Sequence, residues 1–302
     1  MTQHIFGAII TGRGIAANNR GITEGNITTL QKIIWDGHAH TTVSAESIRF
    51  ALRRHLENIE PCNRTYDEVA RTNQWADGAF SRWIKEGQEA PFLDDDLLGF
   101  MSATGPTEER EKGTTKTRKS VLEVTRAVSL TPWQGDVTFN AASPGATPSA
   151  AKKDTKEVAH PTLYGTEMHA TRYQYGIAMT PGRLCVISRA SLALRGLCAL
   201  GEVAGNHGRF LFDFSPESVV FRVTHDPAPR LLYVFEQDFE GKISISEVLR
   251  RVEGGDIKAN ELIIGGALSL SEEERAVLAG ATLLKGVMAA CEAVCQRIVG
   301  AP

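Results

Sequence analysis

The sequence predicts an α+β fold in which one β-sheet is backed by helices and the middle of the chain forms a large insertion. Two observations predict this class. Segments that alternate like strands and segments with the period of amphipathic helices follow one another at irregular intervals. Between them, residues from about 94 to 161 are rich in Pro, Thr, Ser and Lys. The 302 residues, 42% of them hydrophobic, suffice for one large domain or two ordinary ones.

The first third of the chain predicts two strands followed by two helices. The strands are expected at "HIFGAII" and "NITTLQKII", and the loop "WDGHAHTT" comes after them. "SAESIRFALRRHL" then has helical periodicity, with Ser44 as amino-terminal cap and Ile48, Leu52 and Leu56 on one face. "YDEVARTNQWADGAFSRWIKEG" is also expected to be helical.

In the insertion, "SVLEVTRAVSL" and "VTFNA" are the strong strand candidates, and one part of it is expected to form a β-hairpin. Regular structure resumes with a strand at "MHATRYQYGIAMT" and an amphipathic helix at "SRASLALRGLCALGEVA". "FDFSPESVVFRVTH" and "RLLYVFEQDF" predict a pair of strands, and "ISISEVLRRV" begins another helix. From Ser271, a plausible cap with acids in the first turn, one long helix or two are expected.

Charge is unevenly distributed along this chain, whose net charge is −3. Between Arg110 and Arg126 six cations stand against two acids, and three lysines follow at 152, 153 and 156. Acids collect instead at residues 94–96 and 272–274. A local basic surface can bind phosphate even when the total charge is negative. One hypothesis is that the acidic runs of one copy meet the basic cluster of another.

Several classes of protein are disfavoured. No apolar run reaches 18 residues, and "MTQHIFGAII" lacks the basic region and cleavage site of a signal peptide. The spacings of the five cysteines favour buried free thiols over a zinc site or disulfides. We therefore interpret the protein as cytoplasmic, with no membrane partner, no metal and no cofactor.

Two short motifs suggest chemistry that their surroundings do not support. "FGAIITGRGIAA" resembles a dinucleotide-binding fingerprint, but the following "NNRGITEGNI" cannot sustain the helix that the fingerprint requires. In "DGHAH", Asp36, His38 and His40 would share a face of an extended segment, yet no further metal ligand is evident.

The first predicted helix carries Arg49 and Arg53 one turn apart, with Arg54 beside them. Like charges at this spacing destabilise a helix unless something relieves their repulsion. Two interpretations fit the residues equally well. The arginines belong either to a solvated charge ladder with Glu46 and Glu57 or to a face that binds an anion.

Several segments, in this order, resemble the DevR-type backbone subunits of CRISPR effector complexes, within the wider "Cas seven" family of type I systems. The segments are "GIAANNRGITEGNITTLQKI", "HTTVSAESIRFALRRHL", "DDDLLGFM", "RKSVLEVTRAVSL", "EMHATRYQYGIAMT" and "VAGNHGRFLFDFSPESVVFRVT". The resemblance covers about residues 7 to 225, and the last 70 residues carry no motif that matches.

The resemblance implies a ferredoxin-like, RRM-related palm at residues 1–93 and 162–302, with residues 94–161 inserted as fingers and thumb. It also implies a non-catalytic subunit whose copies stack along the CRISPR RNA in a type I surveillance complex (Cascade). The implied partners are the CRISPR RNA, the target DNA strand, other copies of the chain and other effector-complex subunits. A thumb hairpin, for which residues 135–153 are our first choice, would interrupt the guide–target duplex.

The resemblance further implies residues that lie against the guide backbone, on the first helix and on a glycine-rich loop, "AGNHGR". Such contacts read phosphates and A-form shape, which suits a protein that must accept any guide. The residues predicted to bind RNA are Asn19, Arg20, His40, Ser44, Arg49, Arg53, Arg54, Lys116, Arg118, Lys119, Gly205, Asn206, His207 and Arg209.

Two alternatives remain open at this stage. Related subunits of type III complexes cut target RNA with an aspartate in the loop before this helix, and Asp36 lies in the corresponding loop. The other alternative is a stand-alone RNA-binding regulator that never assembles into a complex. The negative net charge disfavours this second alternative, because a lone binder usually needs more positive surface.

Overall fold

The structure, a computed structural model, describes residues 1–84, 90–104, 114–143, 162–205 and 210–298. Its strands are β1 (His4–Thr11), β2 (Gly14–Ala16), β3 (Asn19–Glu24), β4 (Ile27–Leu30), β5 (Lys32–Trp35), β6 (His38–Val43), β7 (Arg64–Asp67), β8 (Thr72–Trp75), β9 (Phe100–Thr104), β10 (Thr114–Arg118), β11 (Leu122–Val124), β12 (Ala127–Ser129), β13 (Val137–Ala142), β14 (Thr162–Glu167), β15 (His169–Thr171), β16 (Tyr173–Met179), β17 (Pro216–Thr224), β18 (Glu236–Gln237), β19 (Ile243–Ser244), β20 (Leu262–Gly266) and β21 (Thr282–Leu284). The helices are α1 (Ala45–Leu56), α2 (Ser81–Ile84), α3 (Leu93–Leu98), α5 (Arg189–Cys198), α6 (Ser246–Glu253), α7 (Glu272–Val277) and α8 (Val287–Cys295), with 3-10 turns η1 (Pro181–Arg183) and η2 (Ala259–Glu261).

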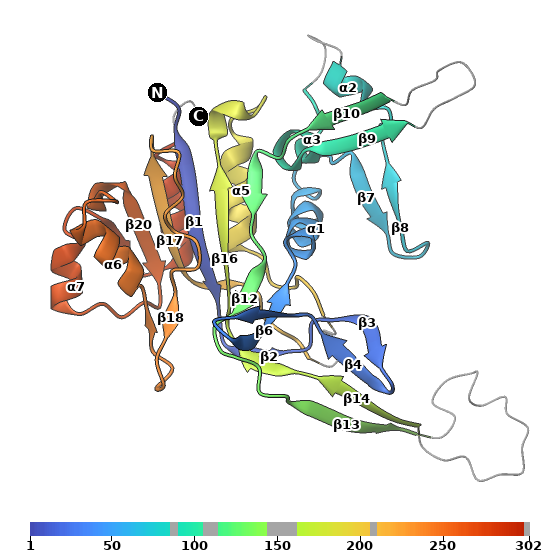
Figure 1. The fold of residues 1–302 in the computed structure, drawn as a ribbon. Helices are drawn as coiled ribbons and strands as arrows, with labels where there is room; N and C mark the ends of the chain where they lie inside the picture. The colour runs from blue at the N-terminus through green and yellow to red at the C-terminus, as the bar shows by residue number, and fades with distance from the viewer. Residues whose placement is uncertain (85–89, 105–113, 144–161, 206–209, 299–302) are drawn as a thin grey trace, which may run out of the picture.

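A nine-stranded sheet forms the centre of the molecule (Figure 1). Its order is β21-β20-β17-β1-β16-β12-β6-β5, and β11 also pairs with β16. In the middle of the sheet, Ile9 of β1 lies opposite Tyr175 of β16 and Val219 of β17. The α+β class predicted from the sequence is confirmed, and the strands expected at "HIFGAII" and "YQYGIAM" are its central ones.

Both faces of the sheet are buried, because successive residues of β1 point to opposite sides. Ile5 and Ile9 join a core that contains residues of α1, α5 and α8. Phe6 and Ile10 join a second core, formed with residues 225–281, which we name the C-terminal lobe. Each such side chain contributes roughly 1.5–3 kcal/mol when it is fully buried. A strand covered on both sides therefore reads as a continuous apolar run, as "HIFGAII" does.

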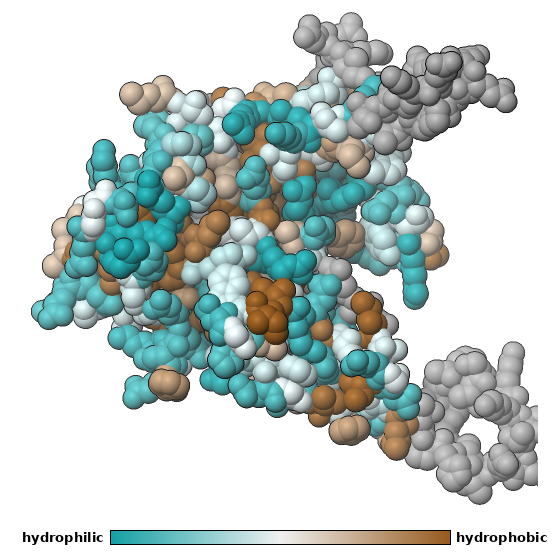
Figure 2. All heavy atoms as spheres, in the orientation of Figure 1, coloured by the Kyte–Doolittle hydropathy of each residue, from teal (hydrophilic) through white to brown (hydrophobic). Residues whose placement is uncertain are grey.

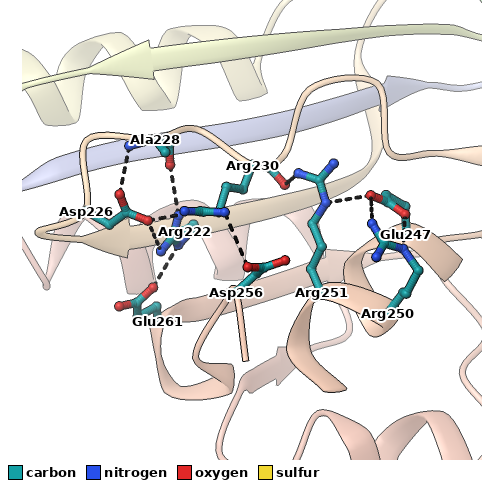
Figure 3. Close-up of polar contacts among 9 residues, drawn as sticks. All are labelled: Arg222, Asp226, Ala228, Arg230, Glu247, Arg250, Arg251, Asp256 and Glu261. Atoms are coloured by element: carbon teal, nitrogen blue, oxygen red, sulfur yellow. Dashed lines mark hydrogen bonds and ion pairs between the residues drawn. The ribbon is translucent and has the colours of Figure 1, made fainter. Parts of the chain in front are cut away.

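The C-terminal lobe is tied to the sheet through Arg222 of β17, whose side chain is 2% exposed (Figure 3). Its Nε donates to Glu261 (2.7 Å), and its Nη2 donates to Asp226 (3.0 Å). Its Nη1 donates to the carbonyl of Ala228 (2.9 Å). The guanidinium of Arg230 extends this network to Asp256. A buried arginine with a partner on each nitrogen is stable where an unpaired one would not be.

Two further units project from the sheet on the side of α1 (Figure 1). One contains the hairpins β7–β8 and β9–β10 with α2 and α3, and the other is a four-stranded sheet of order β13-β14-β4-β3. Within residues 94–161, β9 pairs with β10 as a hairpin, while β13 pairs with β14, which lies after residue 161. Figure 2 shows apolar residues gathered over this four-stranded sheet. Its strands carry the exposed apolar residues Ile22, Phe139 and Leu163, which are 61%, 80% and 63% exposed.

Three expectations for secondary structure are wrong. The loop expected at "WDGHAHTT" is a turn only at Asp36 and Gly37, and His38–Val43 forms β6, which pairs with β5 and β12. The segment expected to be helical from Tyr66 forms β7 and β8 and only the short helix α2. Asp67 explains part of this, since its carboxylate accepts from the main-chain N–H groups of Val69 and Ala70 (2.9 Å each) and stabilises a turn. "RLLYVFEQDF" does not pair with β17, whose neighbours are β1 and β20, and only its residues 236–237 are in a strand.

The end of the chain and the insertion also need correction. The final helical segment is two helices, α7 and α8, separated by the edge strand β21, and Ser271 caps α7 as expected. Part of the segment expected to be the insertion, residues 94–161, belongs to the central sheet. β11 and β12 lie within residues 94–161 but pair with β16 in the central sheet, because their apolar residues fit its buried faces. Cys185 is exposed, whereas the other four cysteines are buried free thiols.

The acidic run at residues 94–96 is buried, which overturns the hypothesis that it meets another copy. All six residues of α3 are buried. Asp94 accepts from the main-chain N–H groups of Asn63 (2.6 Å) and Arg64 (3.1 Å). Asp96 accepts from the main-chain N–H of Cys185 (3.0 Å) and from Nη1 of Arg189 (3.0 Å). These carboxylates are internal anions that join segments distant in sequence.

We expect Asp96→Asn to lower the free energy of unfolding by about 3 kcal/mol, because it removes one of the two carboxylates that neutralise the buried guanidinium of Arg189. Urea unfolding followed by circular dichroism measures this loss. Glu240→Gln, at an exposed turn of the C-terminal lobe, is the matched control and should change stability by less than about 0.5 kcal/mol. Equal stability of both variants would contradict the structural role of Asp96.

Candidate nucleic-acid interface

Helix α1 begins as the sequence predicts. Ser44 is the N-cap, and its Oγ accepts from the main-chain N–H of Ser47 (3.3 Å). Ile48, Leu52 and Leu56 are fully buried against the central sheet and α5. This fixed apolar face decides where the polar residues of the helix point. Arg49 and Arg53 turn toward α3, whereas Arg54 is exposed and pairs with Glu68.

A cavity of about 430 Å³ lies between α1, the β7–β8 hairpin, α3 and the base of the β9–β10 hairpin. Four arginines line it, together with two carboxylates and several apolar side chains. The lining residues are Arg49, Arg53, Arg64, Trp75, Asp94, Asp95, Leu98, Gly99, Phe100, Met101, Arg118 and Ser120. We name this site the arginine cavity.

The protein supplies hydrogen-bond acceptors to only some of the N–H groups of the cavity arginines. Arg49 donates to the carbonyl of Leu98 (2.5 Å) and to Oγ of Ser120 (3.2 Å). Arg53 is 6% exposed and donates through Nε to Asp94 (3.1 Å). Three arginine nitrogens are nevertheless buried without a partner in the described residues: Nη1 of Arg53, Nε of Arg64 and Nε of Arg118. Unmade hydrogen bonds of buried charged donors are costly, so the cavity favours an additional acceptor.

The pKa values show the same surplus of positive charge. Burial lowers the pKa of Arg49 and of Arg64, and the nearby charge of Arg53 lowers both further. Burial raises the pKa of Asp95 to about 7, and the neighbouring Asp94 adds to this increase. Near neutral pH, Asp95 is therefore only partly ionised, and Asp94 is left to balance several cations. Such a site attracts anions.

The solvated charge ladder is wrong for Arg53, which is buried, and Arg49 is half-buried. The sequence alone could not show this, because the partner carboxylates come from α3, 41 residues away from Arg53. Arg118 also lines the cavity, where it pairs with Asp96 (3.3 Å) and donates to the carbonyl of Arg183 (2.7 Å). The structure thus brings together three residues that the sequence predicts separately to bind RNA.

Gly205, at the start of the glycine-rich loop, lies elsewhere, against the segment before β3. Gly205 has a φ of +111°, and a Cβ at this position would come within 3.0 Å of the carbonyl oxygen of Ala17 and Oδ1 of Asn18. Asn19 follows directly, and its Nδ2 donates to the carbonyls of Thr28 and Thr29 (3.3 Å each). Gly205 and Asn19 are therefore brought close, and Gly205 has a structural requirement of its own. The backbone of Arg20 is in β3, while its side chain and residues Asn206, His207 and Arg209 lie outside the described part of the chain.

His40, Lys116 and Lys119 have different surroundings. His40 is 8% exposed, and its Nδ1 lies 2.7 Å from the carbonyl oxygen of Ser129. It lines a separate cavity with Trp35 and Tyr233, so it does not join the arginines. Lys116, in the middle of β10, and Lys119, directly after the strand, are both exposed. Lys116 makes one long contact, to the carbonyl of Ala79 (3.4 Å).

Sequence reasoning missed Arg64 and Trp75, because it assigned most of their surroundings to a helix. The available signal was the turn residue Asp67. In the described residues, no group of three potential metal ligands is placed to hold an ion. Asp36 and His38 are exposed at the β5–β6 turn, where Asp36 has a φ of +47°. None of the described helices has the length and hydropathy that a membrane crossing requires.

Comparisons with known proteins agree with one another. Residues 9–253 match the family described as "CRISPR-associated negative auto-regulator DevR/Csa2". The chain is 62% identical, over 99% of its length and 98% of the relative's, to a protein of Myxococcus xanthus (strain DK1622) named "CRISPR-associated protein Cas7/Cst2/DevR". Its fold is similar to a chain of a "CRISPR RNA-guided surveillance complex" (TM-score 0.56, 14% identity, 97% and 98% of the two chains). It is also similar to one of a "CRISPR RNA-guided surveillance complex, pre-nicking" (TM-score 0.57, 11% identity, 96% and 99%).

The raised pKa of Asp95 predicts a pH dependence of stability. Between pH 4 and pH 7 the folded protein holds a proton on Asp95 that the unfolded chain releases, so the contribution of this group to stability falls as pH rises. Asp95→Asn removes this titration and keeps an oxygen for Asn63. As the pH rises from 5 to 8, the free energy of unfolding of the variant should increase relative to that of the wild type by on the order of 2 kcal/mol, since one pKa unit corresponds to about 1.4 kcal/mol.

Urea unfolding of both proteins at pH 5, 6.5 and 8 measures this difference. Glu240→Gln should follow the pH dependence of the wild type, because Glu240 is exposed. Parallel curves for wild type and Asp95→Asn would contradict the assignment of a proton to Asp95.

Proposed function

Since the chain belongs to the DevR/Csa2 family of CRISPR-associated proteins, we propose that it is a non-catalytic backbone subunit of a type I CRISPR surveillance complex. In this role several copies bind one CRISPR RNA side by side with other effector subunits and support recognition of a target DNA strand. The central sheet would be the RRM-related palm. The unit with β7–β10 would be the fingers, and the β13–β14 hairpin the thumb.

The observation that carries the proposal is the surplus of arginine donors in the arginine cavity. Arginine nitrogens that are buried without acceptors fit phosphate oxygens, which accept several hydrogen bonds in a planar, bidentate geometry. Contacts of this kind carry no base information, which suits a subunit that must hold any guide. The exposed Lys116 and Lys119 lie close to Arg118 in sequence and would extend the positive surface away from the cavity.

The β13–β14 hairpin has the surface that a thumb would need. Phe139 of β13 lies opposite Gly165 of β14, and Leu163 follows on the same face. These exposed apolar side chains have no core to join, and such a face is suited to contact with unstacked bases or with another protein (Figure 2).

One alternative, a stand-alone regulator, is tested by the form in which the protein is purified. The family description names a negative auto-regulator, and a stand-alone RNA-binding regulator would fit that name. Protein purified from its native host should carry RNA of one uniform length in a particle of several copies. A monomer free of RNA would favour the regulator and count against the backbone subunit.

We expect Lys116→Ala combined with Lys119→Ala to weaken RNA binding without unfolding the protein, since both side chains are exposed. Each lost phosphate contact should flatten the logarithmic salt slope by roughly 0.7 for a single strand, so the pair should flatten it by about 1.4. The loss should be equal for guides of different sequence. Fluorescence anisotropy across a salt series measures both quantities.

The control is Lys242→Ala with Lys258→Ala, which removes two exposed cations of the C-terminal lobe. An unchanged slope in the first pair, or the same change in both pairs, would remove β10 from the proposed surface.

We expect the complex not to cut complementary RNA, although Asp36 lies on an exposed turn. Incubation with a labelled complementary RNA and Mg²⁺, followed by gel electrophoresis, tests this. Fragments at regular intervals that disappear in Asp36→Ala would instead identify a type III-like nuclease and overturn the non-catalytic assignment.

A further inference from the structure

We propose that Trp75 and Arg64 of the β7–β8 hairpin complete a nucleotide subsite at the arginine cavity. In this subsite the cavity arginines hold a phosphate, and the exposed part of the Trp75 indole stacks on the base attached to it. The inference rests on the proposed RNA-binding function and adds a base contact in the fingers unit.

Trp75 is placed and supported as a stacking surface. Its side chain lines the cavity and is 45% exposed, which is unusual for tryptophan beside a packed aromatic cluster. Phe80 contacts it edge to face at 5.6 Å and is itself 3% exposed. Phe80 in turn stacks on Phe100 at 3.9 Å. The indole is therefore held by a rigid aromatic row, so a base that stacks on it meets a surface already ordered.

Arg64 connects this aromatic surface to the phosphate-binding arginines. Its guanidinium lies 5.7 Å from the centre of the Trp75 ring, and its Nε is buried without a partner. Its main-chain N–H donates to Asp94, the carboxylate that also accepts from Arg53. One carboxylate thus fixes the positions of both arginines. The Nη1 of Arg53, also without a partner, belongs to a side chain that is only 7% exposed.

The combination of groups selects a nucleotide over a simple anion. An inorganic anion would use the arginines alone and would gain nothing from an exposed indole. A nucleotide uses both, because its phosphate matches the guanidinium donors and its base has a flat π-surface. The cavity volume of about 430 Å³ lies in the range of small-ligand sites, roughly 300–1,000 Å³. Every base has a π-face, so the subsite would tolerate any guide sequence.

The decisive experiment compares the full chain and its variants on two probes: a single-stranded RNA and the same RNA with all bases removed from a central stretch. Trp75→Leu should bind the intact RNA about 10-fold more weakly than the wild type, the scale of one lost base–aromatic stack. It should bind the abasic RNA as the wild type does. Trp75→Phe should recover much of the affinity for intact RNA.

Arg64→Gln should weaken binding of both probes and flatten the salt slope by about 0.7, since it removes a phosphate contact. Phe239→Leu, a fully exposed aromatic of the C-terminal lobe, is the matched control and should bind both probes like the wild type. The thermal midpoint of each variant shows that it is folded.

Equal losses of Trp75→Leu on both probes would make Trp75 a structural residue and overturn the subsite. Unchanged binding of both probes by Trp75→Leu would also overturn the subsite. If Lys116→Ala with Lys119→Ala still weakened RNA binding in that case, the proposed function would stand. Wild-type protein that binds neither probe would instead refute the proposed function. An acidic peptide that competes with RNA on the wild type but not on Trp75→Leu would assign the site to a protein partner and overturn the nucleotide.

Discussion

The buried carboxylates of α3 are the constraint on which the arrangement around the arginine cavity depends. Three consecutive aspartates are 0–4% exposed, and each is held by donors from other segments. Asp94 fixes the start of β7 and Arg53 of α1, Asp95 accepts from Asn63, and Asp96 holds the chain before α5. Charges this deep persist only where partners surround them. The α3 carboxylates therefore determine how the units with β7–β10 sit against the central sheet.

The same constraint explains why the arginine cavity is cationic. The carboxylates that anchor α3 draw arginines inward from α1, β7 and β10, yet Asp94 and Asp96 are already shared with main-chain N–H groups. Asp95 holds its charge weakly, because burial and Asp94 both oppose its ionisation. Structural anchoring and surplus positive charge thus arise from one arrangement. The arginines are positioned before any ligand arrives, so a phosphate would not have to order long side chains on binding.

Much of the central sheet could be predicted from the sequence, and much of the site could not. Ser44, Ile48, Leu52 and Leu56 specify α1 by local rules of capping and periodicity, and "YQYGIAM" specifies β16 in the same way. Local rules failed where distant partners decide. "DDDLL" has the composition of a solvated acidic helix, and only the long-range donors make its burial possible. The β7–β8 hairpin was missed for a local reason, because the turn at Asp67 was outweighed by an apparent helical pattern.

The resemblance and the structure support different parts of the functional argument. Family membership identifies the chain as a CRISPR-associated protein. The family match extends to residue 253, beyond the motifs that carry the resemblance. It does not decide which cations meet RNA, because a motif position such as Arg53 can be occupied by an internal ion pair. The proposed assignment rests on geometry instead: Arg53 and Arg64 line the cavity and each has a buried nitrogen without a partner, whereas Arg54 is exposed and pairs with Glu68. An arginine that is both anchored by a carboxylate and left with an unused donor is suited to a phosphate. Its orientation is already fixed, and its remaining hydrogen bond is still to be made.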